Sequence, residues 1–206
     1  MKEKIIIIGG GGHARSILAI LKDNRLSSNL LGYTDQNKSN LPLKYLGRDE
    51  EVLSRYKNKK VKLALGIGIN IKLREKILKK FHEYKFLSLI DKDSIISINC
   101  KIAEGSVIFP GAVIGPNVKI GPFSVIHNSV VIEHDVSISE NSYIGPGAVV
   151  CGNAKIGKNV LLGANSTMIQ DTSIERNCIL GAGSVLIKSC KIQNKSLIGI
   201  PAKIKK

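Results

Sequence analysis

A pair of adjacent ionisable side chains, His134 and Asp135, is the most chemically suggestive feature of this sequence. The pair closes the segment 127–135, whose charged residues interrupt an otherwise regular apolar pattern. A carboxylate next to a histidine fixes the imidazole tautomer and stabilises the imidazolium, which is the arrangement that a general base requires. The sequence therefore predicts proton abstraction by His134, with a solvated surface pair as the alternative interpretation.

A glycine-rich turn near the N-terminus offers a site of a different kind. Four glycines and His13 follow a run of isoleucines at 5–8, and an apolar-periodic stretch comes directly after them. This order predicts a strand, a turn and a helix, whose first N–H groups favour a phosphate or another anion. We expect the segment 9–13, Asp35 and the segment 68–70 to converge at the strand carboxyl ends.

Metal and disulfide chemistry is not expected. The four cysteines form no Cys-x-x-Cys pair, and three of them, Cys100, Cys178 and Cys190, occupy small-residue positions of a repeat. A zinc-dependent hydrolase would need several histidines on adjacent coils, which His127 and His134 do not supply. We therefore expect reduced cysteines that serve packing.

The element that carries His134 is predicted by a six-residue periodicity. Every sixth residue from 96 onward is a large aliphatic, up to Ile192, Ile198 and Ile204, and a small residue or Val stands two positions before each. A helix has a period of 3.6 residues and a strand a period of two, so neither explains the pattern. It predicts a parallel β-helix of about six triangular coils with the aliphatic residues inside. Glycines directly after them, such as Gly115, are expected to provide turn dihedrals.

An abrupt change of pattern near residue 90 divides the chain into two predicted domains. Residues 1–90 alternate strand-like and helix-like stretches, which predicts a small Rossmann-like parallel α/β sheet with a ligand crevice at the carboxyl ends of its strands. About ninety residues supply half of a dinucleotide fold, so a single nucleotide is favoured over a nicotinamide cofactor. Residues 91–206 form the predicted β-helix domain. Further strands are expected at 30–34, 62–65 and 86–90, and helices at 49–56 and 72–85.

The charge of the chain narrows the class of ligand. The 206 residues carry a formal net charge of +15, which suits anionic small ligands or acidic surfaces. Nucleic acid is not expected, because no aromatic-rich or motif-bearing reading face accompanies the charge. The four isoleucines near the start are too few for a signal peptide or a membrane span, so a cytoplasmic location is expected.

Several motifs together resemble the bacterial sugar acetyltransferases: the glycine turn at 9–13, Gly-Tyr-Thr-Asp at 32–35, Ile-Glu-His-Asp at 132–135 and Gly-Ile-Pro-Ala-Lys at 199–203. This family includes the amino-sugar N-acetyltransferases of bacillosamine and perosamine synthesis and the sialic acid O-acetyltransferases. The resemblance covers essentially the whole chain, and it implies that residues 1–90 bind the nucleotide sugar and that residues 91–206 are a left-handed β-helix acyltransferase domain. It implies acetyl-CoA-dependent N-acetylation of a nucleotide-linked amino sugar by a homotrimer, with sialic acid O-acetylation and a noncatalytic scaffold as the alternatives.

The resemblance also assigns residues to three groups. It implies that His134 is the catalytic base and that Asp135 orients it. The contacts with the nucleotide sugar fall on Gly11, Gly12, His13, Asp35 and, more loosely, Gly68. The contacts with acetyl-CoA fall on Tyr143, Gly152, Ala164 and Ala182.

Three positions depart from the family pattern. Relatives often carry His where Tyr143 stands, Asn where His127 stands and a second acid where Gln36 stands.

The expected reaction is a direct transfer in which a backbone N–H, first of all that of Gly152, stabilises the oxyanion. A covalent acetyl-enzyme is not expected, because no serine or cysteine nucleophile has a base in a suitable arrangement.

Overall fold

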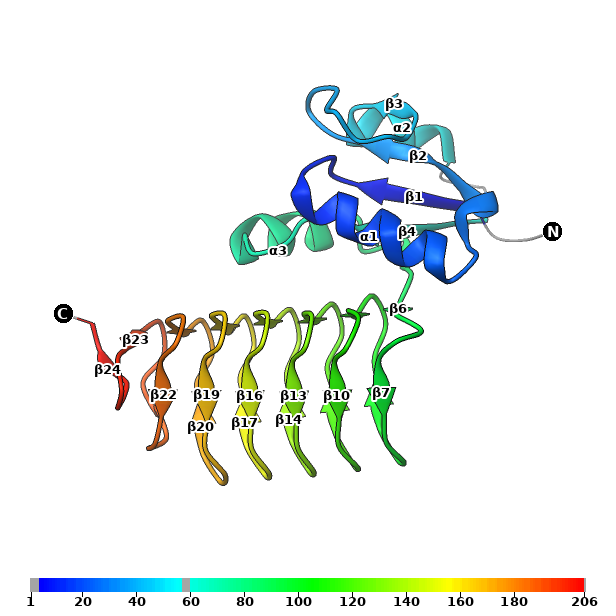
Figure 1. Cartoon of the computed structure of the whole chain (residues 1–206). Coiled ribbons are helices and arrows are strands. Elements are labelled where there is room, and N and C mark those ends of the chain that lie inside the picture. Colours follow the sequence, from blue (N-terminus) through cyan, green and yellow to red (C-terminus); the bar gives the residue numbers. More distant parts are fainter. Residues whose placement is uncertain (1–3, 57–59, 206) are drawn as a thin grey trace. The chain divides into compact units, whose positions relative to one another are not determined.

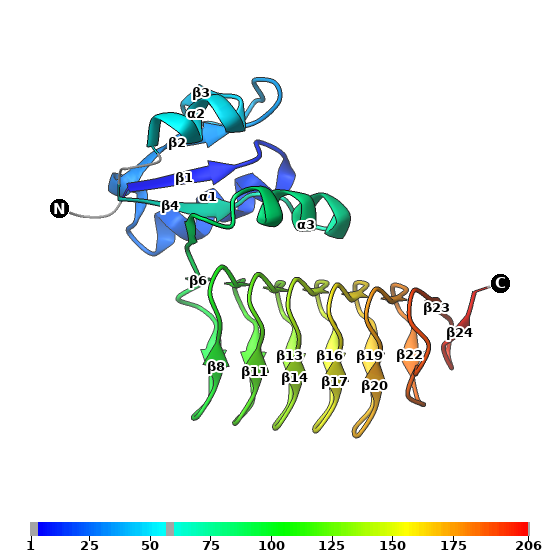
Figure 2. The same ribbon diagram turned by 180° about the vertical axis from the view of Figure 1, so that it is seen from behind.

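The computed structural model describes residues 4–56 and 60–205 and divides into two compact units, with the boundary between Leu89 and Ile90 (Figures 1 and 2). The first unit is a parallel sheet with helices, and the second is a parallel β-helix of hexapeptide repeats. The predicted fold class is confirmed.

The first unit is a five-stranded parallel sheet in the order β3-β2-β1-β4-β5. Its strands are β1 (Lys4–Ile8), β2 (Leu30–Thr34), β3 (Tyr45–Gly47), β4 (Val61–Leu65) and β5 (Lys85–Phe86). Its helices are α1 (Gly12–Asp23), η1 (Ser27–Asn29), α2 (Asp49–Tyr56) and α3 (Ile71–Lys80). Helix α1 covers one face of the sheet, and α2 and α3 cover the other (Figures 1 and 2). The isoleucines of β1 are almost completely buried because the central parallel strand is covered on both faces.

Two elements of this unit differ from the sequence prediction. The helix expected at 72–85 begins at Ile71, where the Asn70 side chain caps it by accepting the Leu73 N–H at 3.0 Å, and it ends at Lys80. The next residues turn, so that Lys85 pairs with Lys62 of β4. The strand expected at 86–90 is consequently split between β5 and β6 (Leu89–Ile90), and β6 belongs to a sheet of the β-helix.

The second unit winds around three sheets, which are its three faces. The first face contains β6, β9 (Val107–Ile108), β12 (Val125–Ile126), β15 (Tyr143–Ile144), β18 (Leu161–Leu162), β21 (Ile179–Leu180), β23 (Ser196–Ile198) and β24 (Lys203–Ile204). The second face contains β7 (Ile95–Ile96), β10 (Val113–Ile114), β13 (Val131–Ile132), β16 (Val149–Val150), β19 (Thr167–Met168) and β22 (Val185–Leu186). The third face contains β8 (Lys101–Ile102), β11 (Lys119–Ile120), β14 (Ser137–Ile138), β17 (Lys155–Ile156) and β20 (Ser173–Ile174).

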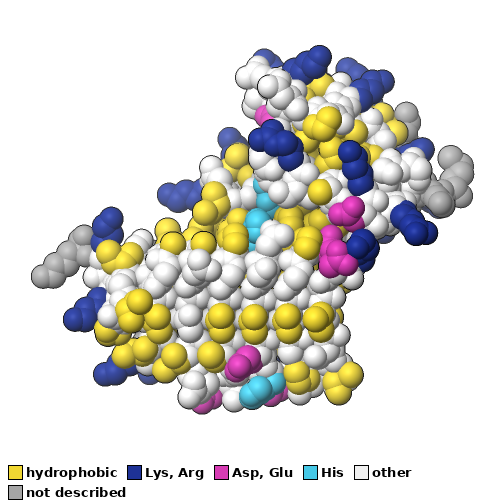
Figure 3. Space-filling model, in the orientation of Figure 1, with side chains coloured by type: hydrophobic (Ala, Val, Ile, Leu, Met, Phe, Trp, Pro, Cys, Tyr) yellow, Lys and Arg dark blue, Asp and Glu magenta, His cyan; other side chains and the backbone are white. Residues whose placement is uncertain are grey.

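The interior of the β-helix is a column of aliphatic side chains. The sixth-residue positions from Ile108 to Leu186 are each at most 3% exposed. Their neighbours in the strands point outward, because side chains alternate along a strand. On the second face this places Ile95, Val113, Val131 and Val149 in one outward row, and hydrophobic side chains form regular rows across the coils in Figure 3.

Except for Gly199 (φ 99°), the glycines that follow the aliphatic positions of the repeat do not provide the turn dihedrals, contrary to the expectation from sequence. Left-handed backbone lies two residues further on, at Asn117 (φ 60°), Asp135 (φ 59°) and Asn153 (φ 60°) and at the matching position of the other coils. Gly115 is instead required by close approach, because a Cβ there would lie 2.8 Å from the Glu133 carbonyl carbon and the His134 nitrogen of the next coil. Asn and Asp tolerate left-handed backbone better than most residues, which explains their recurrence in the turns.

The last coil also departs from the predicted series. Ile192, Ile198 and Ile204 were expected inside but are 54%, 49% and 41% exposed. The coil is shorter than the others, so that Cys190 pairs with Ile174 and Leu197 pairs with Leu180. Cys190 and Leu197 therefore fill the interior, and Cys190 does not occupy a small-residue position.

None of the helices within residues 4–56 and 60–205 combines the length and the apolarity that crossing a membrane requires.

Candidate active site

The first unit contains a cavity of about 310 Å³ at the carboxyl ends of its strands. The chain changes direction across the sheet between β1 and β4, the position at which open parallel sheets bind ligands. The cavity is lined by all five residues assigned to acceptor binding, namely Gly11, Gly12, His13, Asp35 and Gly68. The structure thus brings together residues that lie far apart in the sequence.

The glycine turn is tied to the end of β2 by Asp35. One Asp35 carboxylate oxygen accepts the Gly10 N–H at 2.7 Å, and the other accepts the Gln36 N–H at 2.7 Å. Gly10 is packed so tightly that a Cβ would lie 2.6 Å from the Tyr33 ring. Gly11 is the N-cap residue of α1 and, having no side chain, gives this helix start no side-chain cap.

The polar residues that line the cavity also include His13 and Asp49. A Cβ on Gly68 would lie 3.1 Å from the His13 side chain, so the two residues pack against each other. Asp49, in the first turn of α2, lines the cavity and is 5% exposed. Burial raises the pKa of the Asp49 carboxyl. Sequence reasoning missed Asp49, because an acid in the first turn of a helix is explained by the helix dipole alone.

His134 and Asp135 lie on the corner between the second and third faces, directly after β13. His134 Nδ1 is 2.9 Å from Asp135 Oδ2, and the two side chains are 54% and 47% exposed. The hydrogen bond with His134 lowers the pKa of the Asp135 carboxyl, and a second one from Asn117 contributes. A carboxylate only accepts, so Nδ1 carries the proton and Nε2 of the neutral ring presents a lone pair. The predicted pair therefore has the tautomer of a general base.

Gly152 lies against His134 one coil further along the β-helix. A Cβ on Gly152 would come within 2.6 Å of His134 Nε2, so this position accepts only glycine while the ring keeps its place. The Gly152 N–H, expected to stabilise an oxyanion, donates to Glu133 Oε2 at 3.0 Å. Burial raises the pKa of the adjacent Cys151 thiol, and the Glu133 charge adds to that effect. In the free chain, the expected oxyanion donor is thus engaged by a carboxylate.

The four residues assigned to acetyl-CoA do not gather in one place within a single chain. Gly152 lies on the corner of His134, whereas Tyr143 lies in β15 on the first face. Ala164 and Ala182 occupy successive coils of another corner, between the first and second faces, where the Ala164 carbonyl accepts the Gly183 N–H at 2.8 Å.

His127 is enclosed by aromatic side chains on the first face. Its ring stacks on Phe109 with a centroid distance of 4.5 Å and an interplanar angle of 13°, and Tyr143 lies at 5.8 Å. Burial lowers the pKa of the His127 imidazole, which favours its neutral form. Within the chain His127 belongs to a different face from the His134 corner, so the two histidines do not form a pair.

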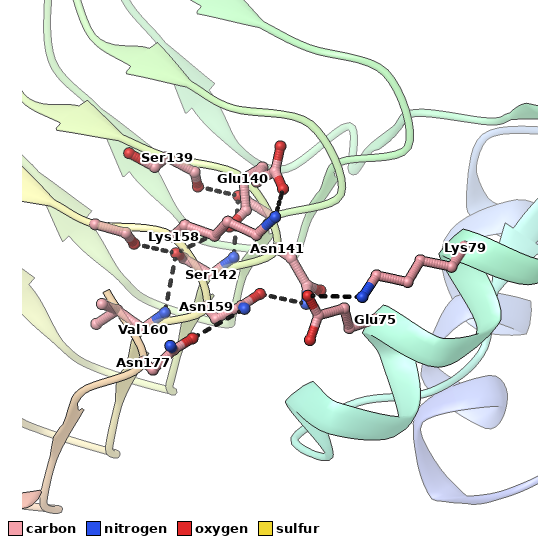
Figure 4. Close-up of polar contacts among 12 residues, drawn as sticks. Glu75, Lys79, Ser139, Glu140, Asn141, Ser142, Lys158, Asn159, Val160 and Asn177 are labelled. Atoms are coloured by element: carbon pink, nitrogen blue, oxygen red, sulfur yellow. Dashed lines mark hydrogen bonds and ion pairs between the residues drawn. The ribbon is translucent and has the colours of Figure 1, made fainter. Parts of the chain in front are cut away.

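The third corner, between the third and first faces, is held by polar side chains (Figure 4). Glu140 and Lys158 form an ion pair there. Asn141 Nδ2 donates to Asn159 Oδ1 at 2.9 Å, and Asn159 Nδ2 donates to Asn177 Oδ1 at 3.0 Å. Across the described parts of the chain, no cluster of three or more His, Cys, Asp or Glu side chains could hold a metal ion.

Both units match known protein families. Residues 4–81 match the PglD N-terminal domain, and residues 99–134, 111–145 and 135–170 match the bacterial transferase hexapeptide family of six repeats. Residues 153–188 match the hexapeptide repeat of succinyl-transferase. No curated protein matches the chain.

Solved structures match the chain over its full length. PerB from Caulobacter crescentus, in complex with CoA and GDP-perosamine, is 26% identical with a TM-score of 0.91, and the match covers 100% of this chain and 99% of that one. A mutant of GDP-perosamine N-acetyl transferase from the same organism is 25% identical with a TM-score of 0.91, and the match covers 100% and 98%.

A third structure shares the fold at lower identity. The acetyltransferase domain of PglB from Neisseria gonorrhoeae, in complex with acetyl coenzyme A, is 22% identical with a TM-score of 0.91, and the match covers 100% of both chains.

Proposed function

Because this chain joins a PglD N-terminal domain to bacterial transferase hexapeptide repeats, we propose that it is an acetyl-CoA-dependent acetyltransferase that N-acetylates a nucleotide-linked amino sugar. The observation that carries the proposal is the His134–Asp135 pair, joined at 2.9 Å on an exposed corner of the β-helix. The proposed acceptor is a UDP-linked 4-amino sugar or a related nucleotide amino sugar. Its product would serve the synthesis of bacterial surface glycans or glycoproteins.

The chemical step is a direct transfer. The acceptor nitrogen attacks the thioester carbonyl carbon, and His134 Nε2 takes the proton that the nitrogen loses as the new N–C bond forms. Asp135 stabilises the resulting imidazolium through Nδ1. When the C–S bond breaks, the same proton passes to the departing CoA thiolate, so the base is regenerated and every proton is accounted for.

The Gly152 N–H is the proposed oxyanion donor, and its bond to Glu133 has a consequence for the reaction. A single N–H cannot serve the Glu133 carboxylate and the oxyanion equally well, so Glu133 must turn away when the thioester binds. The freed N–H then meets the charge that develops on the carbonyl oxygen, where such donors contribute most.

The cavity of the first unit is the proposed acceptor site. Helix α1 directs the N–H groups of its first turn, near Gly11 and Gly12, toward a phosphate. The Asp35 carboxylate holds the turn and can accept further hydrogen bonds from a ribose or a base, because each of its oxygens has two lone pairs. A free sialic acid has no group that matches a nucleobase site, which favours the nucleotide sugar.

The assembly that we propose is a homotrimer. Within one chain Ala164 and Ala182 lie on a different corner from His134, so an acetyl-CoA that touches all of these residues must bridge two copies. The outward aliphatic row of the second face gives such copies an apolar surface to share. We also propose a cytoplasmic location, because all four cysteines are free thiols.

The proposed function is tested by release of the CoA thiol across a panel of acceptors. The panel contains UDP-linked 4-amino sugars, GDP-perosamine and free sialic acid, and mass spectrometry identifies each product. We expect an amide product on a nucleotide amino sugar. Efficient acetylation of free sialic acid without turnover of nucleotide amino sugars would replace the proposal with O-acetylation.

A further inference from the structure

The corner that carries His134 also carries a short ladder of side-chain amides. Asn99 Nδ2 donates to Asn117 Oδ1 at 3.4 Å, and Asn117 Nδ2 donates to Asp135 Oδ1 at 3.1 Å. The other oxygen of Asp135 bonds His134 Nδ1 at 2.9 Å. The amides therefore form a continuous chain of hydrogen bonds that ends at the imidazole.

A second ladder, on the corner between the third and first faces, consists of asparagines only and contains no carboxylate. There each amide nitrogen donates to the next amide oxygen, at 2.9 Å from Asn141, 3.0 Å from Asn159 and 2.9 Å from Asn177. The ladder that includes Asn117 has the same polarity, but it stops at Asp135 because a carboxylate has no proton to pass on. Asp135 can then give its second oxygen to His134.

We propose that Asn117 is a positioning residue for the reaction: its amide fixes the Asp135 carboxylate so that Oδ2 faces His134 Nδ1. This inference rests on the proposed function of His134. The Asp135 side chain is 47% exposed, and an exposed carboxylate held by one bond only is free to change rotamer. The left-handed backbone at both positions, φ 60° and 59°, places the two side chains in register on successive coils.

The charges around the pair are few. Lys119 acts on Asp135 together with His134 and Asn117, and all three lower the pKa of its carboxyl. Glu133 bonds Gly152 and not the His134 ring. Asn117 is thus the neutral donor that holds the carboxylate from the side opposite His134.

The test compares Asn117→Gly with Asn177→Gly. Glycine removes the amide and tolerates the left-handed backbone, which Asn177 shares at φ 59°. Asn177 belongs to the other ladder and is exposed like Asn117, so it controls for the loss of one rung. For Asn117→Gly we expect kcat to fall by about three- to tenfold, as for the loss of one ordinary hydrogen bond, with both KM values retained. For Asn177→Gly we expect the kcat of the unaltered protein.

A second measurement does not depend on turnover. With the histidines labelled with ¹⁵N, the two ring-nitrogen shifts of neutral His134 report its tautomer. We expect the Nδ1–H form in the unaltered chain and in Asn177→Gly, and an increased fraction of the Nε2–H form in Asn117→Gly. Asn117→Ala, which removes the amide without adding a charge, should have the same effect if the glycine variant fails to fold.

Equal kcat and equal tautomer ratios in the Asn117 variants and Asn177→Gly would overturn the inference. If no acceptor is acetylated by the unaltered protein, the proposed function fails, while the tautomer measurement still decides whether Asn117 positions the ring.

Discussion

The His134 ring is held on two sides, by the Asp135 carboxylate at Nδ1 and by the Gly152 backbone next to Nε2. The first contact sets the tautomer. The second sets the direction of the lone pair, because the ring cannot turn into space that the Gly152 backbone occupies. In the proposed reaction, the acceptor nitrogen meets a ring whose orientation is set before the substrate binds, which lowers the entropy cost of the step.

His134→Ala tests the base directly. The side chain lies outside the aliphatic column, so we expect an unchanged melting temperature and a loss of kcat on the order of 10²- to 10⁴-fold, the usual range for a lost general base. Asp135→Asn should cost less, because Nε2 remains in place. His82→Ala, at an exposed position after α3, is the matched control and should keep the original kcat. A His134→Ala protein with near-original turnover would reject the assignment.

Gly152→Ala tests the second contact. The new methyl group would lie 2.6 Å from Nε2, so the ring must move out of its place and we expect kcat to fall by about tenfold or more. The acceptor KM should stay the same, because the cavity of the first unit is unaltered. Steady-state kinetics with each substrate varied separately check this, and a changed acceptor KM with a constant kcat would argue against it.

At the scale of elements, each coil is positioned by backbone contacts that the glycines permit. A methyl group at Gly115 would lie 2.8 Å from the backbone of the next coil, so we expect Gly115→Ala to lower the free energy of unfolding by about 1–3 kcal/mol. Gly183→Asn is the control, because its Cβ would meet nothing within 4 Å and its left-handed φ of 64° suits Asn. Denaturant unfolding of both variants measures the difference, and equal midpoints would contradict the role given to Gly115.

The elements that sequence periodicity predicted well are those whose pattern repeats. The aliphatic column from Ile108 to Leu186 needed only the six-residue period, because stacked coils repeat the same environment. The role of these glycines was predicted wrongly at every position but Gly199, since the period places them in a turn without distinguishing a positive φ from close approach. The last coil was predicted wrongly because Ile192 continues the period by type while the register shortens.

For the candidate site, the sequence was informative where a motif concentrates several residue types. The glycine turn and Asp35 were expected to converge, and they line one cavity. The sequence could not predict that Asp49 lines the cavity or that the Gly152 N–H bonds Glu133, because each depends on a contact that only folding brings about. The same is true of Asn117, which stands one coil away from the residue that it contacts.

At the scale of the whole molecule, we propose that the first unit binds the acceptor and that the second unit binds acetyl-CoA and carries the base. Asp35→Ala removes the carboxylate that ties the glycine turn to β2, and so we expect a raised acceptor KM. The acetyl-CoA KM should change little, because the residues assigned to that ligand belong to the other unit. Kinetics with each substrate in turn check this, and an equal rise of both KM values would place Asp35 in a structural role.

Mixing two inactive variants tests the proposed assembly. His134→Ala and Ala182→Trp affect different corners, so in a trimer with sites between copies some sites of a mixed oligomer receive neither change. Refolding the two variants together at equal amounts should restore roughly a quarter of the original activity, because one in four pairings of neighbours is intact. The separately refolded variants are the control, and no recovery on mixing would place the whole site in one chain.

The short last coil also affects whether another molecule could pair with the end of the β-helix. A parallel coil with the eighteen-residue spacing of the others, as between Val113 and Val131, would present an open row of N–H and C=O groups to the end of another molecule. Here Leu197 pairs with Leu180 seventeen residues away, and β24 then runs antiparallel to β23. A second β-helix that approaches this end finds neither the spacing nor the strand direction that it needs. We therefore expect the irregular coil to disfavour the stacking of a second β-helix on this edge of the sheet.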